Sequence, residues 1–373
     1  MPQTSNWTRR EVLQAGVAGT AAVVMNELQA HAESLAKDAE SFAEDKGKSG
    51  WIDAHSHIWT RDVKSYPLAK GKTVADLDPP SFTTEELIKT AKPHGVTRVV
   101  LIQHHTYYGW DNSYMTDTAK KYPGRFRVVG MVDDTKPKPD AAMRSLLKRW
   151  VTGFRITPRI RGKEKWLDGP GMTAMWKCAA ETRQAMCCLI DAADLPAVNR
   201  MCKKHAETPV VIDHFARVGV DGKIRDRDVK RLCNLAKHKH VSLKISAYYA
   251  LGKKTPPYLD LLPMIRRVYE AFGAKRLMWA SDCPYQLGGT NTYGASIDLV
   301  RNQLDFVSKT DREWLLRKTA EKVYFFDKER TPRHAPIDGG ARTTHKCRSM
   351  LDRRAGVIDD ERRHFGVHSA PVC

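Results

Sequence analysis

The chain has 373 residues, of which 42% are hydrophobic, and its 62 Lys and Arg against 43 Asp and Glu give a formal net charge of +19. This size and apolar content suffice for one large domain or two ordinary ones with a buried core. No apolar run reaches the roughly 18 to 20 residues that span a bilayer, which argues against an integral membrane protein. The positive charge favours acidic small molecules, anionic polymers or a membrane surface as partners. No recognised nucleic-acid-binding motif is present, so nucleic acid is not an expected partner. The sequence gives no indication of the oligomeric state.

Residues 1 to 32 have the layout of a cleavable export signal. Arg9 and Arg10 precede a mildly apolar stretch over residues 15 to 25, and Ala-His-Ala follows at residues 30 to 32. The arginine pair and the modest hydrophobicity predict the twin-arginine route, which carries folded proteins. An amphipathic N-terminal helix is the alternative. We therefore expect export to the periplasm or cell surface of a bacterium, followed by a charged spacer over residues 33 to 50.

Eight short apolar segments, the first of which begins at Trp51, have the composition of β-strands. They cover residues 51–58, 98–103, 126–132, 151–156, 186–191, 209–214, 241–246 and 276–281. Helical patterns lie after each of them, at 84–93, 112–121, 139–149, 171–183, 194–206, 226–238, 258–272 and 294–307, and a final helix closes the domain near Phe326. This alternation predicts an α/β protein, a single (β/α)8 TIM barrel over residues 51–326. An open doubly wound sheet is the alternative, but no glycine-rich phosphate loop follows the first strand.

The last 47 residues, 327 to 373, differ in composition from the rest of the chain. They contain scattered Arg, Asp and His with few large apolar residues and no sustained period. This composition predicts a basic, disordered C-terminal tail, and a basic attachment tail is the alternative.

The first predicted strand contains the segment IDAHSHI, in which two histidines are separated by one residue. Alternate side chains share a face of a strand, so Asp53, His55 and His57 point to the same side. Ile52 and Ala54 then lie on the opposite face, which we expect to pack against the outer helices. Both imidazoles would look into the barrel, where they can touch one ion or one carbonyl oxygen. Taken alone, an HxH pattern is weak evidence, because buried core histidines also occur in this arrangement.

Two further polar residues end later strands. His214 ends VVIDH and Asp282 ends LMWASD, and the carboxyl ends of barrel strands are where active sites are assembled. A satisfied core histidine and a strand-end cap are the alternatives for these two residues when each is taken alone. Three imidazoles and one carboxylate at the same end of a barrel suit a divalent ion such as Zn²⁺.

Residues 51 to 326 resemble the amidohydrolase-related branch (amidohydrolase 2) of the amidohydrolase superfamily of TIM-barrel hydrolases. The resemblance rests on an ordered series of segments, IDAHSHIW, RVVLIQ, VTGFRI, VVIDHFAR, VSLKIS and RLMWASDCP. DHFAR and ASDCP are most similar to enzymes that open sugar lactones or the pyrone-dicarboxylate lactone. The resemblance therefore implies a hydrolase that opens a lactone or related cyclic ester. A decarboxylase or hydratase acting on a carboxylated substrate, and a non-catalytic periplasmic binding protein, are the alternatives.

The resemblance implies an active site of His55, His57, His214 and Asp282. Some relatives use this set to hold one metal ion, for which zinc is expected here, whereas some lactonases of the branch work without a metal. In both cases Asp282 is the implied general base for a water, and His214 acts with it. VTGFRI offers Arg155 and no lysine that would bridge two metals, so a second metal is not expected.

Five further residues are candidates for substrate binding: Arg155, Arg217, Gln103, Lys244 and Tyr285. Arginine can hold a carboxylate or carbonyl oxygen through paired donors, and a lysine can do so as a point charge. The alternative interpretation of each cation is a charge without a role in binding, either solvated or paired at the surface. The loop HHTYYGWDN after Gln103 either stacks on a ring substrate or packs as a lid, and the sequence leaves both open.

Overall fold

The computed structural model describes residues 25–26, 29–30, 32–42, 49–162 and 166–326. The predicted tail lies outside the described residues, and so does nearly all of the predicted export signal. Within the part of the chain that the structure describes, no helix combines the length and the hydrophobicity needed to cross a membrane.

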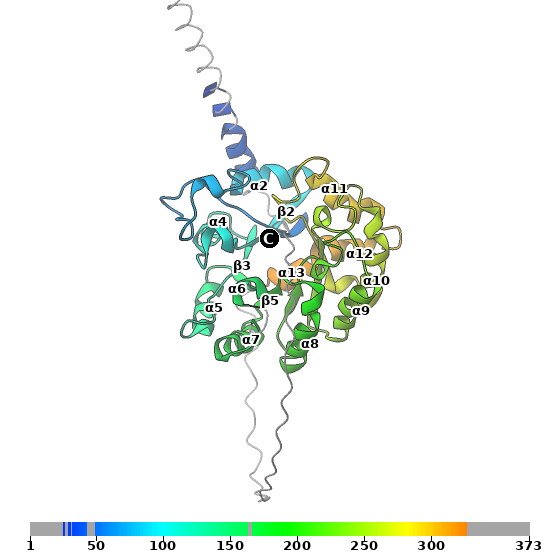
Figure 1. Ribbon diagram of the computed structural model, residues 1–373. Helices are drawn as coiled ribbons and strands as arrows, with labels where there is room; N and C mark the ends of the chain where they lie inside the picture. The colour runs from blue at the N-terminus through cyan, green and yellow to red at the C-terminus, as the bar shows by residue number, and fades with distance from the viewer. Residues whose placement is uncertain (1–24, 27–28, 31, 43–48, 163–165, 327–373) are drawn as a thin grey trace, which may run out of the picture.

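Eight parallel strands form one sheet in the order in which they occur along the chain, so the prediction of a (β/α)8 barrel is confirmed. Figure 1 looks along the barrel. The strands are β1 (Trp51–Ser56), β2 (Val96–Ile102), β3 (Phe126–Gly130), β4 (Val151–Ile156), β5 (Ala185–Cys188), β6 (Val210–Ile212), β7 (Val241–Ser246) and β8 (Leu277–Ala280). β1 and β8 meet just beyond their carboxyl ends, where the Asp282 amide donates to the His55 carbonyl at 2.8 Å and the His57 amide donates to the Cys283 carbonyl at 2.7 Å. This junction closes the barrel and joins two segments that carry predicted site residues.

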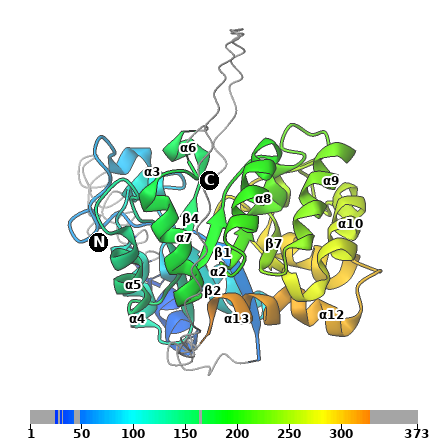
Figure 2. The ribbon, with the colours of Figure 1, turned by 90° about the horizontal axis from the view of Figure 1, so that it is seen from below.

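Helices surround the sheet, and α13 lies across the amino-terminal ends of the strands (Figure 2). The α-helices are α2 (Thr84–Ala91), α3 (His105–Tyr108), α4 (Ser113–Lys121), α5 (Pro139–Leu147), α6 (Pro158–Arg161), α7 (Pro170–Thr182), α8 (Leu195–Lys204), α9 (Asp226–Asn234), α10 (Leu262–Phe272), α11 (Tyr293–Asp298), α12 (Lys309–Glu313) and α13 (Thr319–Tyr324). Wider π-helical turns continue α11 through Leu299–Gln303 and join α12 to α13 through Trp314–Lys318. The predicted closing helix is thus present, interrupted by a wider turn.

The barrel interior contains a core of its own, separate from the larger core between strands and helices. It collects one alternate set of strand residues, with Tyr324 of α13 at its base. Ile52 and Ala54 belong to this interior cluster. The prediction that they face the outer helices is therefore wrong. The pairing of β1 with β2 shifts register between Asp53 and Ser56, which interrupts the strict alternation and allows His55 to face inward after Ala54.

A helix over residues 32–42 precedes the barrel, within the segment predicted as a charged spacer. Phe42 is buried with its ring 5.7 Å from that of Phe126, and the Arg125 guanidinium lies over its face at 4.9 Å. An ion pair of 3.0 Å joins Asp38 to Lys92 beside α2. The end of this helix nearest the barrel is therefore packed on it.

Candidate active site

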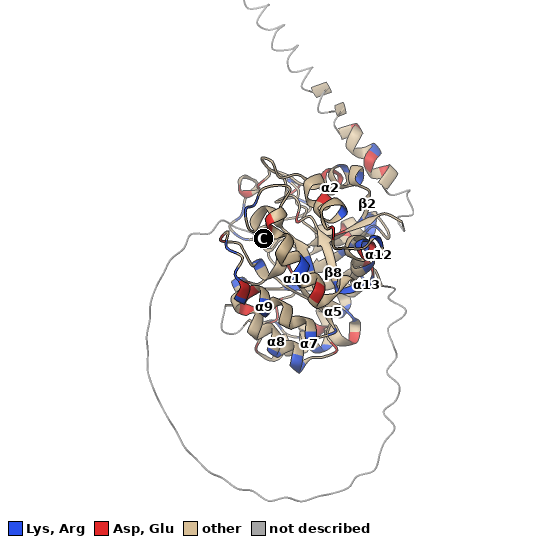
Figure 3. Cartoon of the chain, turned by 90° about the vertical axis from the view of Figure 1, so that its right-hand side faces the viewer, with Lys and Arg blue, Asp and Glu red and all other residues tan. Residues whose placement is uncertain are grey.

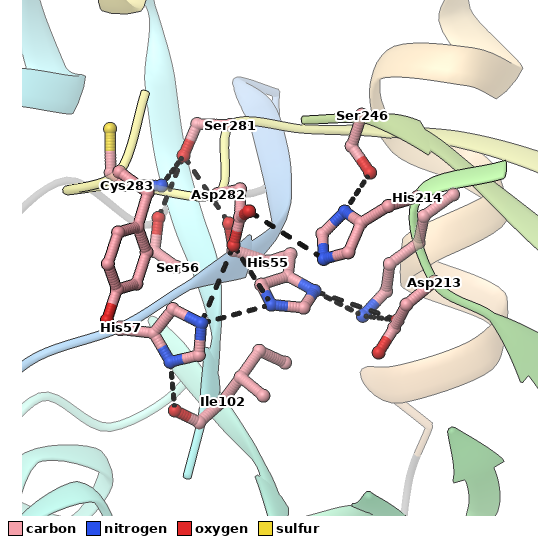
Figure 4. Close-up of polar contacts among 12 residues, drawn as sticks. His55, Ser56, His57, Ile102, Asp213, His214, Ser246, Ser281, Asp282 and Cys283 are labelled. Carbon is pink, nitrogen blue, oxygen red and sulfur yellow. Dashed lines mark hydrogen bonds and ion pairs between the residues drawn. The ribbon is translucent and has the colours of Figure 1, made fainter. Parts of the chain in front are cut away.

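His55 and His57 lie at the carboxyl end of β1 and their Nε2 atoms are 3.3 Å apart (Figure 4). The Nδ1 of His57 lies 2.8 Å from the Ile102 carbonyl, which can only accept, so Nδ1 carries the proton. Burial holds the pKa of His57 well below 6.5, so this imidazole is neutral and its Nε2 presents a lone pair. The strand thus delivers a nitrogen ligand or hydrogen-bond acceptor into the barrel.

Asp282 follows β8 in a left-handed conformation, with a φ of 64°, and is fully buried. Its Oδ1 lies 3.3 Å from His55 Nε2 and 3.5 Å from His57 Nε2. The Tyr249 hydroxyl donates to Oδ2 at 2.8 Å. Oδ1 has no hydrogen-bond partner among the described residues. Burial raises the pKa of Asp282, which makes its ionised form a stronger base than an exposed aspartate.

Asp213 and His214 end β6 and both reach the same site. The four residues from His214 to Arg217 have positive φ values of 51° to 54°, so the chain turns immediately after Asp213. The ring of His214 lies 4.4 Å from that of His55, and its Nε2 lies 3.8 Å from Asp282 Oδ2. Its Nδ1 lies 2.8 Å from the Ser246 hydroxyl, while its Nε2 is buried without a hydrogen-bond partner among the described residues.

Two buried cations flank His55. Arg155 Nη2 lies 2.8 Å from His55 Nε2, and Lys244 Nζ lies 3.2 Å from His55 Nδ1. Asp213 balances this charge, with Lys244 at 3.0 Å and Arg155 at 3.5 Å. Burial, then Lys244 and His214, hold the pKa of His55 well below 6.5. A neutral imidazole has one lone pair, so His55 can accept from one of the two cations at a time.

The nitrogen and oxygen atoms form two groups that could hold a metal ion, and His55 belongs to both. The first is His55, His57 and Asp282, and the second is His55, Asp213 and His214. Within each group the candidate ligand atoms lie within 4.8 Å of one another. Neutral imidazoles with a carboxylate are the donors that Zn²⁺ prefers, and the partnerless Asp282 Oδ1 and His214 Nε2 fit such an ion. The donor types therefore fit the divalent ion that the sequence predicts, but His214 falls in the second group and not with His57 and Asp282.

Three of the five predicted substrate-binding residues, Arg155, Lys244 and Tyr285, lie beside histidines of the site. Arg155 and Lys244 contact His55, as described above. Tyr285 is half-buried beside two histidines, with its hydroxyl 2.5 Å from His104 Nε2 and its ring 5.7 Å from that of His57.

Gln103 and Arg217 are both engaged with protein groups. The Gln103 amide donates to the carbonyls of Gly109 and Asp111 at 2.6 and 2.9 Å, which fixes the loop around α3. Its Oε1 is buried with no hydrogen-bond partner among the described residues. Arg217 donates to Asp191 at 2.8 Å.

The aromatic loop after β2 packs largely against the protein. The His104 ring stacks on that of Tyr107 at 4.0 Å, and Tyr107 meets Trp59 edge to face at 5.0 Å. The Tyr108 hydroxyl accepts from the Thr60 amide at 3.0 Å. These buried contacts favour the packed-lid interpretation for Tyr107 and Tyr108.

Sequence reasoning missed three polar residues around the site. Asp213 was hidden by strand alternation, which places it opposite His214, and Ser246 ends the predicted strand VSLKIS without a charge to mark it. Tyr249 follows that strand in a non-periodic turn. Asp53, which alternation places on the face of His55 and His57, accepts from the Ser281 amide, the Ser281 hydroxyl and the Tyr293 hydroxyl at 2.5 to 2.9 Å and so joins β1 to the end of β8.

Two characterised proteins are similar to this chain over most of its length. L-fucono-1,5-lactonase of Burkholderia ambifaria is 26% identical over 291 residues, which cover 76% of this chain and 98% of that protein. 4-Sulfomuconolactone hydrolase of Rhizobium radiobacter is 27% identical over 249 residues, which cover 66% of this chain and 78% of that protein. The names of both relatives describe the hydrolysis of a lactone.

Solved structures share the fold. A probable 2-pyrone-4,6-dicarboxylic acid hydrolase from Acinetobacter baumannii, with citric acid bound, aligns with a TM-score of 0.62 and 21% identity, over 74% of this chain and all of that one. An amidohydrolase from Burkholderia multivorans with bound zinc aligns with a TM-score of 0.59 and 21% identity, over 75% of this chain and all of that one. A family model described as Amidohydrolase matches residues 52–326, the whole barrel. The chain belongs to the amidohydrolase family.

Proposed function

We propose that this protein is a hydrolase that opens a lactone or related cyclic ester, with Asp282 as the base for the attacking water. The observation that carries the proposal is the position of Asp282. Its Oδ1 is buried, partnerless among the described residues, and 3.3 to 3.5 Å from two imidazole nitrogens. The lactone hydrolysis named in both sequence relatives supports this reaction.

The two carboxylate oxygens of Asp282 have different surroundings, and this difference suits the residue to act as a base. The Tyr249 hydroxyl occupies Oδ2, which fixes the carboxylate plane and leaves Oδ1 facing the histidines. The raised pKa of Asp282 increases its affinity for the proton that water gives up. After attack, the proton on Oδ1 can return to the oxygen of the ring bond that breaks, which completes hydrolysis without net proton transfer to the enzyme.

Polarisation of the lactone carbonyl falls to the groups opposite Asp282. His55 and His57 are the imidazoles that would hold one divalent ion together with Asp282, and zinc is the ion that this donor set suits. His214 belongs with His55 and Asp213 to the second group. Such an ion supplies Lewis acidity to a bound carbonyl. In the metal-free state, Arg155 is the charged donor nearest to His55 Nε2, at 2.8 Å, and is placed to stabilise the developing oxyanion directly.

The substrate we propose is an acidic or sugar-derived lactone. Arg155 and Lys244 bring two buried positive charges into the barrel, and Asp213 balances one of them before Asp282 is counted. An anionic group on the substrate would pair with Arg155, which shares Asp213 with Lys244 as its counter-ion. The sulfonated lactone named for one relative supports a substrate with a negative charge.

The first test is a panel of lactones assayed by acid release, with neutral sugar lactones and carboxylated lactones of matched ring size. We expect turnover of at least one lactone and higher kcat/KM for the carboxylated member of a pair. Asp282→Asn should lower kcat by several orders of magnitude with the fold retained, and Asp305→Asn, an exposed surface aspartate, should leave kcat unchanged. Release of carbon dioxide from a carboxylated substrate, with no lactone opened, would instead identify a decarboxylase.

We also propose that the protein is exported by the twin-arginine route. The proposal rests on Arg9, Arg10 and the Ala-His-Ala segment that follows the apolar stretch. Replacing both arginines with lysine should retain the protein in the cytoplasm of the expressing bacterium. Unchanged export of this variant would refute the proposal.

A further inference from the structure

A strongly basic cavity lies at the amino-terminal end of the barrel, the end opposite the active site. It has a volume of about 170 Å³, and Ser242 of β7 contributes to its wall. Its six basic lining residues come from the segments that lead into β5, β7 and β8 and from α13: Arg183, Lys239, His240, Lys275, Arg276 and Lys322. No described aspartate or glutamate lines it.

This grouping lies at the surface, where Lys239, Lys275 and Lys322 are exposed, and differs from the rest of the surface in having one sign of charge. Figure 3 shows positive and negative segments interspersed over the helices, and many of these charges are paired, as in Lys230 with Asp226 at 2.8 Å. By contrast, Lys239, Lys275 and Lys322 form no ion pair with a described carboxylate. Like charges gathered around one cavity repel each other unless an anion lies between them.

The side chains of the cavity wall are held in place by neutral groups. Arg276 donates through Nη1 to the carbonyls of Ala236 and His238 at 2.8 and 3.0 Å, and through Nε to Phe272 at 2.9 Å. The Arg183 guanidinium lies 4.8 Å from the ring centroid of Phe326. These contacts orient both guanidinium groups without neutralising them, so their charge remains available to a ligand.

His240 is half-buried and lines the cavity, although its Nε2 is covered by protein. Its Nε2 is buried and has no hydrogen-bond partner among the described residues. His240 lines the cavity together with Ser242, so a hydroxyl and an imidazole stand beside the charged donors.

We propose that this cavity binds a phosphate group. The donors come from four segments, namely the loop before β5, β7 with the residues that lead into it, the turn before β8, and α13, so several can reach one ligand. A tetrahedral oxyanion presents three or four acceptor oxygens and matches such an arrangement better than a planar carboxylate with two. The site is distinct from the active site, because Ser242 and Ser246 of β7 lie about 13 Å apart along the strand.

The test uses the full chain purified in phosphate-free buffer, with two probes. Inorganic phosphate is titrated by calorimetry, and phosphatidylcholine vesicles with or without phosphatidylglycerol are tested by co-sedimentation. The variant is Lys239→Glu with Lys275→Glu. The matched control is Lys64→Glu with Lys70→Glu, which changes the net charge equally at two exposed positions in the loop after β1.

We expect saturable binding that weakens at least tenfold in the cavity variant and stays unchanged in the control. Binding of inorganic phosphate identifies a soluble ligand as the source, and binding confined to phosphatidylglycerol vesicles identifies a lipid headgroup. The proposal is overturned if the native protein binds neither probe, or if both variants weaken binding equally. If charge reversal destabilises the fold, Lys239→Gln with Lys275→Gln keeps the same test, and circular dichroism verifies folding.

Discussion

Asp213 is the most informative residue to perturb, because it balances two buried cations beside the candidate active site. The substitution Asp213→Asn keeps the shape of the side chain and removes its charge. Lys244, which is completely buried, then loses a partner at 3.0 Å, and Arg155 loses one at 3.5 Å. Burial alone would raise the pKa of Asp213, but Lys244, His55 and Arg155 hold it well below 3.8, so the carboxylate is ionised at neutral pH.

The expected loss of stability follows from the uncompensated charge. Removing one partner of a buried ion pair costs about 3 to 5 kcal/mol, because the remaining charge stays in a medium of low dielectric constant. Adding Lys244→Met to Asp213→Asn also removes the buried lysine charge. Of the two cations that Asp213 balanced, only Arg155 then remains. The double variant should therefore be more stable than the sum of the two single variants predicts, by about 1 to 3 kcal/mol.

The assay is urea denaturation at pH 7, followed by circular dichroism, of the native protein, Asp213→Asn, Lys244→Met and the double variant. The kcat of each protein is measured on the same samples. Asp228→Asn is the control, because Asp228 pairs with exposed Arg227 on the surface of α9. It should change the free energy of unfolding by less than about 1 kcal/mol. A similarly small loss for Asp213→Asn, or strict additivity in the double variant, would refute the reasoning about the buried charges.

Three further predictions address the site. Tyr249→Phe removes a hydrogen bond to the Asp282 carboxylate, which is worth about 1.5 to 3 kcal/mol, so kcat should fall about 10- to 100-fold. The control Tyr269→Phe loses a surface contact to Asp311 and should keep kcat. Equal effects of the two substitutions would contradict the prediction. His57→Ala should lower the zinc content of protein purified without chelator, measured by elemental analysis, whereas His238→Ala, whose partner is Asn199, should not, and unchanged zinc in both would contradict the proposed ligand set. Burial lowers the pKa of His55, His57, His104 and His214 below 6.5, so below that pH the unfolded chain binds protons that the folded chain does not. The free energy of unfolding of the metal-free protein should therefore fall as pH drops below about 6.5, by up to about 1.4 kcal/mol per histidine and pH unit, and a stability that stays constant on acidification, measured by urea denaturation, would contradict this.

The strands and their order could be predicted from the sequence because each strand is a short apolar run between polar segments. Val151–Ile156 and Val241–Ser246 agree with the predicted ranges residue for residue, and the other strands differ at their ends. Strand ends are harder to predict, because the carboxyl-terminal residues leave the sheet to form the site. The segment 209–214 shows this, since the sheet ends at Ile212 and the chain turns after Asp213.

The candidate site could be predicted in part, and the errors in its prediction have local structural causes. His55, His57, His214 and Asp282 are brought together, because side chains at the carboxyl ends of barrel strands converge. The interior position of Ile52 could not be predicted, because alternation gives no sign of the register shift in β1. Contacts such as that of Tyr249 with Asp282 depend on the path of a loop, which periodicity does not encode.

Hydrolysis in water enriched with ¹⁸O tests the central claim most directly. The native protein and Asp282→Asn are incubated with a lactone that the native protein opens, and the products are weighed by mass spectrometry. The proposed mechanism predicts one ¹⁸O atom in the carboxylate of each product molecule formed by the native protein, and no product above the uncatalysed background with Asp282→Asn. Undiminished ring opening by Asp282→Asn would contradict the assignment of Asp282 as the base, and a product that has lost carbon dioxide without gaining ¹⁸O would contradict hydrolysis itself.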